Sequence, residues 1–289
     1  MLEIVDTFPA FLDYWGSCQE WVIDVQIERW AQDYLSPWPD LLDMQVEDYR
    51  EQDIDWRDIA REKIFPYLAE RLPAMQAAHA NLLQVGESVY EKALEMLAVT
   101  APAIYVIHVG IGCGAGWVTE FRGKPAILFG LENVAECGWQ GRDAIKGLVA
   151  HEMGHLVHMA WRKQHQVVMG SCPWWQLYEE GFAQYCEGLI LGDHSRHQGH
   201  SDPAWLSWCE DNLGWLAVEF LRKVDADESV RPFFGSWFEL RGKSQTGYYL
   251  GCLAVKRLSE KHSIQEIALL EDPEGVLRPI LEKMVLGSR

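Results

Sequence analysis

The segment HEMGHLVH, from His151 to His158, places three histidines and a glutamate within eight residues. Residues four apart on an α-helix lie about 40° apart around the axis and one turn apart along it. If the segment is helical, His151 and His155 project side by side, and both imidazoles can reach one metal ion. Glu152 lies beside them; it is too short to be an obvious third ligand, but it can reach a water molecule at the ion. The segment therefore predicts a helix that carries a metal site.

The residues around the motif favour such a helix. In GRDAIKGLVAHEMGHLVHMAWRKQ, apolar residues recur at helical spacing on one side, at Ala144, Ile145, Leu148, Val149, Leu156 and Met159. This pattern is typical of an amphipathic helix. We predict the metal helix at about 141–165.

His158 shares the face of His151 but lies two turns further on, about 10 Å along the axis. Ligand bonds to zinc are about 2 Å long, so one ion cannot bind both residues. We expect His158 to line the site or to support a ligand. The pattern H-E-x-x-H-x-x-G-x-x-H is excluded, because His158 and Trp161 stand where it requires Gly and His.

Before the predicted metal helix, the residue pattern changes from helical to strand-like, in APAIYVIHVGIGCGAGWVTEFRGKPAILFGLEN. Its β-branched and aromatic runs, cut by Gly and Pro, predict three short strands at about 103–109, 117–122 and 125–130. The glycine-rich segment GIGCGAG, from Gly110 to Gly116, follows the first of these strands. A dinucleotide fingerprint would continue into a helix, whereas WVTEF is strand-like, so a turn between strands is favoured.

The remaining chain is predicted to be mostly helical. Residues 1–100 form a helical N-terminal region, with a break expected near Pro73. After the metal helix, PWWQLYEEGFAQYCEGLIL begins a helical lobe at about 173–289, with further helices at about 204–223, 247–261 and 274–285. The predicted class is α+β, mostly α, with a small sheet just before the metal helix.

Charge and composition limit the partners. A formal net charge of -18 opposes binding to nucleic acid and to anionic membranes, and it mildly favours cationic groups such as peptide amines. No apolar run is long enough to span a bilayer, and the first residues lack the basic start of a secretory signal. Seven cysteines without a C-x-x-C fit reduced thiols. The expected location is cytoplasmic, with no nucleic-acid or membrane partner; the oligomeric state is left open.

A third metal ligand is expected, because catalytic zinc usually has three protein ligands and a water. The best candidate lies in YEEGFAQY, where a glutamate beside a glycine could approach closely. H-E-M-G-H together with E-G-F-A resembles the gluzincin zinc peptidases, and above all the aminopeptidase N and leukotriene A4 hydrolase family and small cytosolic gluzincins. The resemblance implies one zinc ion held by His151, His155 and Glu180, and it assigns the third ligand to Glu180 rather than Glu179.

Two further segments resemble the same family. TGYYLGCLAVKRL contains Y-x-x-G, and the resemblance implies that Tyr248 stabilises an oxyanion. The alternative is that Tyr248 and Tyr249 simply pack, or that Tyr249 rather than Tyr248 contacts the substrate. FGLEN is one residue short of the family's G-x-M-E-N, whose glutamate pairs with the free amine of the substrate. On that likeness Glu132 binds the substrate; alternatively, it is a solvated or helix-capping residue.

Taken together, the resemblance implies a thermolysin-like zincin core in a catalytic domain at 101–289, with its sheet at about 103–130. The expected reaction is hydrolysis of a peptide or small protein, with Glu152 as general base. An aminopeptidase is favoured over an endopeptidase. Two alternatives stay open: a non-catalytic zinc-binding module, and a zinc hydrolase of a non-peptide amide. Structural zinc sites are mostly rich in cysteine, which favours the enzyme.

Overall fold

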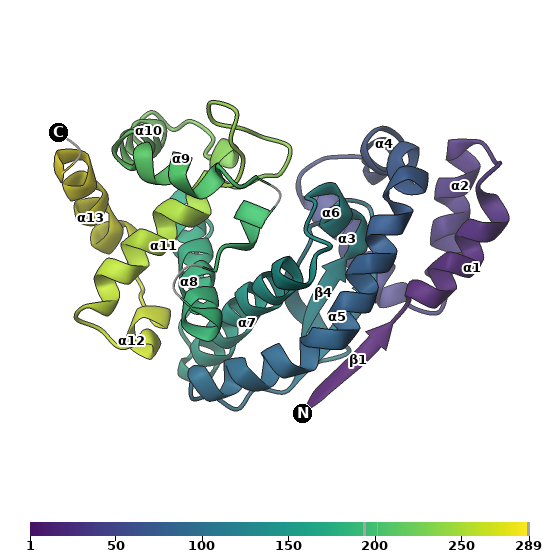
Figure 1. Cartoon of the computed structure of the whole chain (residues 1–289), viewed down its shortest axis with the longest axis horizontal. Helices are drawn as coiled ribbons and strands as arrows, with labels where there is room; N and C mark the ends of the chain where they lie inside the picture. Colours follow the sequence, from purple (N-terminus) through teal and green to yellow (C-terminus); the bar gives the residue numbers. More distant parts are fainter. Residues whose placement is uncertain (193–194, 201, 288–289) are drawn as a thin grey trace. The chain divides into compact units, whose positions relative to one another are not determined.

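The computed structural model describes residues 1–192, 195–200 and 202–287. The fold is α+β and mostly helical, with one small sheet, as predicted (Figure 1). The chain divides into two compact units. Unit one holds residues 1–88 and 102–148, and unit two holds residues 89–101 and the described part of 149–289. The predicted division at residue 101 does not coincide with these units, because a strand at residues 2–6 belongs to the sheet.

The sheet of unit one has four strands in the order β1-β2-β4-β3. The three predicted strands are present within one residue of their expected ends, as β2 (Ala103–His108), β3 (Trp117–Phe121) and β4 (Lys124–Gly130). β1 (Leu2–Asp6) pairs in parallel with β2, β2 pairs in parallel with β4, and β3 runs antiparallel to β4. Every residue of β2 is buried, as expected for a central parallel strand.

β1 was missed because its partner is remote in the sequence. LEIVD lies in a region predicted to be helical, and Leu2 pairs with Ala103. As an edge strand it is only half-buried, so its sequence lacks the long apolar run of a central strand. The pairing brings Thr7 to the sheet, where its N–H and hydroxyl both donate to the carbonyl of Ile107, at 3.0 and 2.9 Å.

Aromatic packing accounts for much of the helical part of unit one. The helices are α1 (Phe8–Cys18), α2 (Ile23–Arg29), α3 (Pro39–Glu51), α4 (Trp56–Ile59), α6 (Leu131–Glu136) and most of α5 (Leu68–Met96). Phe11, Trp30 and Tyr34 are fully buried, and the indole of Trp30 donates to the carbonyl of Val109 at 3.0 Å. Short π-helical turns at 30–34 and 60–64 continue α2 and α4.

The predicted break at Pro73 is wrong, since α5 runs through it without interruption. Proline cannot donate a hydrogen bond to the carbonyl four residues earlier, here on Ala69, and its ring pushes that carbonyl outward. Pro73 and Ala69 are both exposed, so water can satisfy that carbonyl. The buried side chains of Leu68 and Met75 favour the continuous helix.

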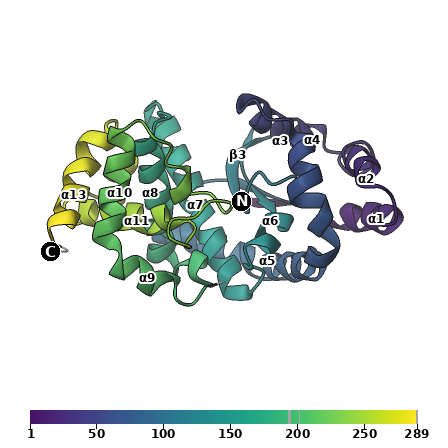
Figure 2. The ribbon, with the colours of Figure 1, turned by 90° about the horizontal axis from the view of Figure 1, so that it is seen from above.

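Unit two is built from helices, several of which lie together in both ribbon views (Figure 1, Figure 2). They are the main part of α7 (Arg142–His165), then α8 (Pro173–Leu191), α9 (Trp205–Asp211), α10 (Leu213–Asp225), α11 (Thr246–Ser259), α12 (Ile264–Ala268) and α13 (Pro273–Gly287). Residues 193–194, 201 and 288–289 of the predicted helical lobe lie outside the described residues.

Two details of unit two differ from the prediction. The helix expected at about 204–223 is split at Asn212, whose backbone and side-chain N–H groups both donate to the carbonyl of Trp208. The short helix α12 was missed, although Ser263 and Glu266 form a capping box at its start.

The helices of unit two approach most closely where they carry small residues. A Cβ added to Gly154 on α7 would lie 2.8 Å from the Cα of Ala183 on α8. One added to Gly251 on α11 would overlap the carbonyl oxygen of Leu177 on α8, and one added to Gly181 would overlap Gly251 itself. The backbones of α8 and α11 therefore touch at paired glycines.

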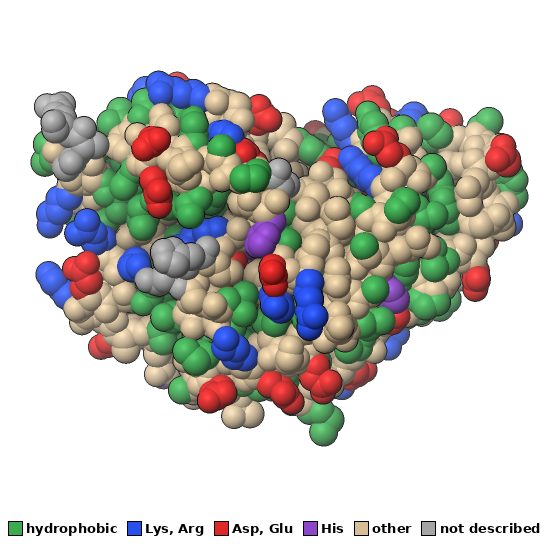
Figure 3. Space-filling model, viewed as in Figure 1, with side chains coloured by type: hydrophobic (Ala, Val, Ile, Leu, Met, Phe, Trp, Pro, Cys, Tyr) green, Lys and Arg blue, Asp and Glu red, His purple; other side chains and the backbone are tan. Residues whose placement is uncertain are grey.

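The described residues show little that points to a membrane, to disulfides or to a charged surface patch. Within the described residues, no helix combines the length and the apolar character needed to cross a membrane. All seven cysteines are free thiols. On the face shown in Figure 3, acidic and basic side chains are scattered among each other.

Replacing Gly251 by Ala is expected to lower the free energy of unfolding by about 1–3 kcal/mol or more, because the new methyl group overlaps backbone that cannot rotate away. The matched control is Gly16→Ala, in α1, where nothing lies within 4 Å of the added Cβ. Since Ala favours a helix over Gly, this control should be neutral or stabilising by up to ~1 kcal/mol. Urea denaturation measures both. Equal effects of the two changes would contradict the close approach of α8 and α11.

Candidate metal centre

The two predicted metal ligands on α7, His151 and His155, both lie close to one carboxylate oxygen. His151 and His155 lie one turn apart, with ring centroids 4.9 Å apart. The Nε2 atoms of His151 and His155 lie 3.2 Å and 3.3 Å from the same oxygen, Oε2 of Glu180. His151 is buried, and the other two are half-buried. Two imidazoles and one carboxylate thus form a group that could hold a metal ion.

Helix packing explains why Glu180 reaches the histidines. Gly154, between the two histidines, lies against Ala183 on α8, and this contact lets α8 pass close to the metal helix. Glu180 is one turn before Ala183 and so comes opposite His151 and His155. The neighbouring Glu179 lines a cavity of about 490 Å³ and acts on His155 only through its charge. The structure therefore brings Glu180, not Glu179, to the predicted ligands.

The electrostatics of the group favour a positive charge between its members. Burial lowers the pKa of His151 to about 4. Burial also opposes a charge on His155, but the Glu180 carboxylate outweighs it and raises the pKa of His155 to about 9. Burial alone would raise the pKa of Glu180, yet His155 and His151 hold it well below its usual range. A half-buried carboxylate is here balanced by a proton on His155, and a metal cation could supply the same balance.

Glu152 lies within the same environment. Its side chain is 5% exposed. Burial raises the pKa of Glu152 to about 7, although His155 acts in the opposite direction. A carboxylate with this affinity for protons is suited to exchanging a proton near neutral pH.

The two candidate tyrosines lie in different surroundings. The ring of Tyr248, in the first turn of α11, is 5.6 Å from that of His151 and 6.0 Å from that of Phe234, measured between centroids. The ring of Tyr249 packs instead against Trp205, in a buried cluster with Cys209. Of the two, it is Tyr248 that the structure brings to the metal group.

His158 belongs to the packing between α7 and α8. Its Nε2 lies 3.1 Å from the hydroxyl of Tyr178, and its ring lies 5.0 Å from that of Phe182. Burial lowers the pKa of His158 to about 3, so it stays neutral. It packs against the helix that carries Glu180.

Sequence reasoning missed two residues beside His151. Glu187 follows Glu180 by two turns of α8, and His197 lies in a 3-10 turn after that helix. The ring of His197 is 5.0 Å from that of His151, and its Nδ1 is 2.8 Å from Oε2 of Glu187. His151, Glu187 and His197 form a second group whose atoms could hold a metal. The seven-residue spacing from Glu180 was a signal for Glu187, whereas nothing in the sequence singled out His197.

Glu132 lies in unit one and is 1% exposed. Its carboxylate accepts hydrogen bonds from the backbone N–H groups of Gly110 at 2.7 Å and Gly112 at 3.2 Å. Burial raises the pKa of Glu132 to about 7, although these N–H groups act to lower it. These contacts favour a role in fixing the glycine-rich loop between β2 and β3. The predicted contact of Glu132 with a substrate amine stays a prediction.

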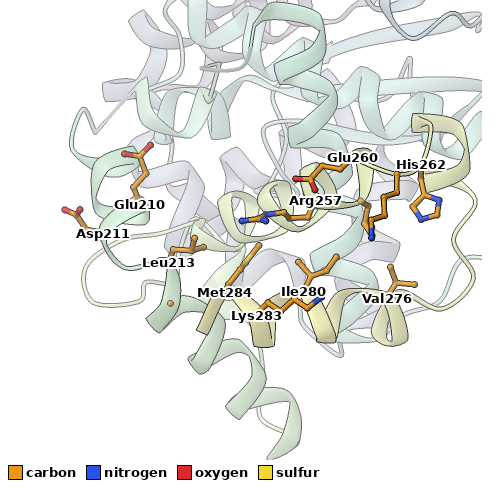
Figure 4. A pocket seen from close by; sticks show the side chains of 13 residues that line it. Glu210, Asp211, Leu213, Arg257, Glu260, His262, Val276, Ile280, Lys283 and Met284 are labelled. Carbon is orange, nitrogen blue, oxygen red and sulfur yellow. The ribbon is translucent and has the colours of Figure 1, made fainter. Parts of the chain in front are cut away.

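A separate hollow of about 740 Å³ lies among the last helices of unit two (Figure 4). Its lining combines apolar side chains with charges of both signs and includes Leu213, Ile280, Met284, Arg257, Lys283, Glu210 and Glu260. None of the predicted site residues lines it. The hollow is therefore separate from the candidate metal centre.

Because the pKa of Glu132 is raised, we expect the free energy of unfolding to depend on pH. Between its usual value of 4.5 and about 7, the folded state holds a proton that the unfolded state releases. The free energy of unfolding of the wild type, relative to Glu132→Gln, should therefore fall as pH rises through this window, by up to ~3 kcal/mol. Urea denaturation of both proteins at pH 4.5, 6 and 8 measures it. A difference that does not change with pH would show that Glu132 is not buried as described.

Comparisons with known proteins assign no family to the chain. No family model, no curated protein and no solved structure matches it.

Proposed function

We propose that this protein is a zinc-dependent peptide hydrolase with one catalytic zinc ion held by His151, His155 and Glu180. The supporting observation is that both imidazole Nε2 atoms converge on one oxygen of Glu180, at 3.2 and 3.3 Å. Two histidines and a carboxylate form a ligand set that suits catalytic zinc and leaves one position open. The proposal includes a thermolysin-like zincin arrangement of the helices that carry these residues.

A zinc ion bound there would polarise a substrate carbonyl and lower the pKa of a water molecule. Glu152 follows His151 directly on α7, and its carboxylate is held in a buried environment. In the proposed reaction, Glu152 takes a proton from the attacking water and returns it to the leaving amine. It remains free for this role because the third ligand comes from α8.

Tyr248 is proposed to stabilise the transition state. Of Tyr248 and Tyr249, Tyr248 has its ring closer to the metal group. The centroid of this ring lies 5.6 Å from that of His151. A phenol is a hydrogen-bond donor, and a donor placed where an oxyanion develops favours the transition state over the bound substrate. The crossing of Gly181 and Gly251 fixes this position, since Tyr248 lies one turn before Gly251.

The proposed substrate is a peptide, cleaved in the cytoplasm. An aminopeptidase is favoured over an endopeptidase, because the negative net charge attracts cationic groups such as the free amine of a peptide. A pair of fluorogenic peptides, one with a free and one with an acetylated amino terminus, decides between the two. The rivals are a non-catalytic zinc-binding module and a zinc hydrolase of a non-peptide amide.

Metal analysis tests the ligand set. We expect one tightly held zinc ion per chain after dialysis. His151→Ala, His155→Ala and Glu180→Ala should each lose it, because two remaining ligands bind zinc weakly. Glu179→Ala is the matched control and should keep it. If Glu179→Ala lost the zinc while Glu180→Ala kept it, the assignment on α8 would be reversed.

Glu152→Gln should keep the zinc and the fold but lose nearly all turnover, since an amide cannot accept the proton of the water. Cleavage of a mixed peptide library, followed by mass spectrometry, provides the substrate and the rate. Zinc binding without any cleavage by the wild type would favour the non-catalytic module. Unchanged turnover in Glu152→Gln would remove Glu152 as the base.

Tyr248→Phe should lower kcat by roughly 100-fold while KM changes little, because its hydrogen bond is made chiefly in the transition state. Tyr249→Phe is the control, and it should keep kcat near that of the wild type because its ring packs on Trp205. Steady-state kinetics on one peptide measures both. A larger loss of kcat from Tyr249→Phe would exchange the two roles.

A further inference from the structure

A second group of ligand-type side chains lies beside the first. It consists of His151, Glu187 and His197, which are 2%, 0% and 2% exposed. Each offers a ligand atom, and these atoms lie within 4.8 Å of one another. The first group has partly exposed members, whereas this one is buried throughout. Neither Glu187 nor His197 has a part in the proposed reaction.

The Glu187 carboxylate is held rigidly. It accepts hydrogen bonds from the side-chain amide of Gln184 at 2.6 Å and from the hydroxyl of Ser195 at 2.7 Å. The backbone N–H of His197 donates to it at 3.0 Å, and the Nδ1 of His197 lies 2.8 Å away. Carboxylates that bind metals are themselves oriented by hydrogen bonds from neighbouring groups, which tune the site. The surroundings of Glu187 are of this kind.

Several buried hydrogen-bond acceptors around Glu187 and His197 have no donor in the described part of the chain. Among the described residues, Nδ1 of His151, Oε1 of Gln184 and Oε1 of Gln198 are buried and have no hydrogen-bond partner. The amide nitrogens of the two glutamines are already engaged, with Glu187 and with Nε2 of His197 respectively. Each unpaired buried acceptor costs about 1–3 kcal/mol, and an electropositive partner would remove this cost. These three atoms therefore lack a donor, although Glu187 itself is well supplied.

We infer that His151, Glu187 and His197 form a second binding position for a divalent cation of the zinc type. Two imidazoles and a carboxylate suit zinc or cobalt. This position lies beyond the proposed function, because it does not include His155, Glu180 or Glu152. It shares only His151 with the catalytic group.

Sharing His151 makes the two positions alternatives. A neutral imidazole has one lone pair, so an ion bound at Nε2 leaves a proton on Nδ1 and closes the second position. The second position is also the weaker one. An ion there must displace a hydrogen bond that His197 already makes to Glu187 or to Gln198. It accepts an ion when the first position is lost.

The test uses the full-length double variant His155→Ala with Glu180→Ala, which removes the first position and keeps His151. Titration with Co²⁺, followed by visible absorbance, and with Zn²⁺, in competition with a chromogenic chelator, measures binding. We expect one equivalent of either ion to bind during the titration and to be lost on dialysis, because the second position is the weaker one. Adding His197→Ala should weaken binding by more than the roughly 10- to 100-fold typical of an outer-sphere partner. Adding His200→Ala, an exposed histidine of the same 3-10 turn, should leave it unchanged.

Glu187→Gln keeps the shape of the side chain and provides the same readout if His197→Ala lowers the melting temperature too far. No binding by the double variant, or equal binding with and without His197→Ala, would overturn the inference and leave Glu187 and His197 as a structural pair. The result is separable from the proposed function. If the wild type cleaves peptides but the double variant binds no ion, only the second position is refuted. If the double variant binds an ion but the wild type cleaves no peptide, only the proposed catalysis is refuted.

Discussion

The close contact of α8 with its two neighbours, α7 and α11, is the constraint on which the candidate metal centre depends. Gly154 and Ala183 let α7 and α8 approach, and Gly181 and Gly251 let α8 and α11 meet backbone to backbone. Glutamate has a short side chain, so Glu180 reaches both histidines only if the two helices touch in this way. The small residues of the motifs are therefore as necessary to the arrangement as the residues that carry the chemistry.

Burial gives this centre its electrostatic character. Carboxylates taken out of water are costly unless they are protonated, hydrogen-bonded or paired with a cation. The carboxylates of Glu180 and Glu187 meet this requirement in different ways. Glu180 is balanced by His155, whereas Glu187 is surrounded by donors from Gln184, Ser195 and His197. His151 stands between them, with one ring nitrogen directed to Glu180 and the other without a partner among the described residues.

Local patterns in the sequence predicted the parts of the fold that local interactions determine. The apolar residues at helical spacing around His151 and His155 predicted a helix, and β-branched runs cut by glycine predicted β2, β3 and β4 to within a residue. Contacts between distant segments were not predictable in this way. β1 is a strand only because β2 pairs with it, and His197 reaches His151 only because the chain turns back after α8. Tyr248 and Tyr249, adjacent on one helix, could be told apart only once the neighbours of α11 were known.

The pairing of Leu2 with Ala103 has a consequence for how the chain folds during synthesis. β1 leaves the ribosome long before its partner, so it waits as an unpaired edge while the intervening helices form. Closing so long a loop raises the contact order, which slows folding and prolongs the exposure of that edge. Residues 89–101, which belong to unit two, are also translated before the sheet of unit one is complete. Neither unit can therefore finish folding from the amino-terminal half of the chain alone, and a nascent chain arrested near residue 100 should be a client for chaperones.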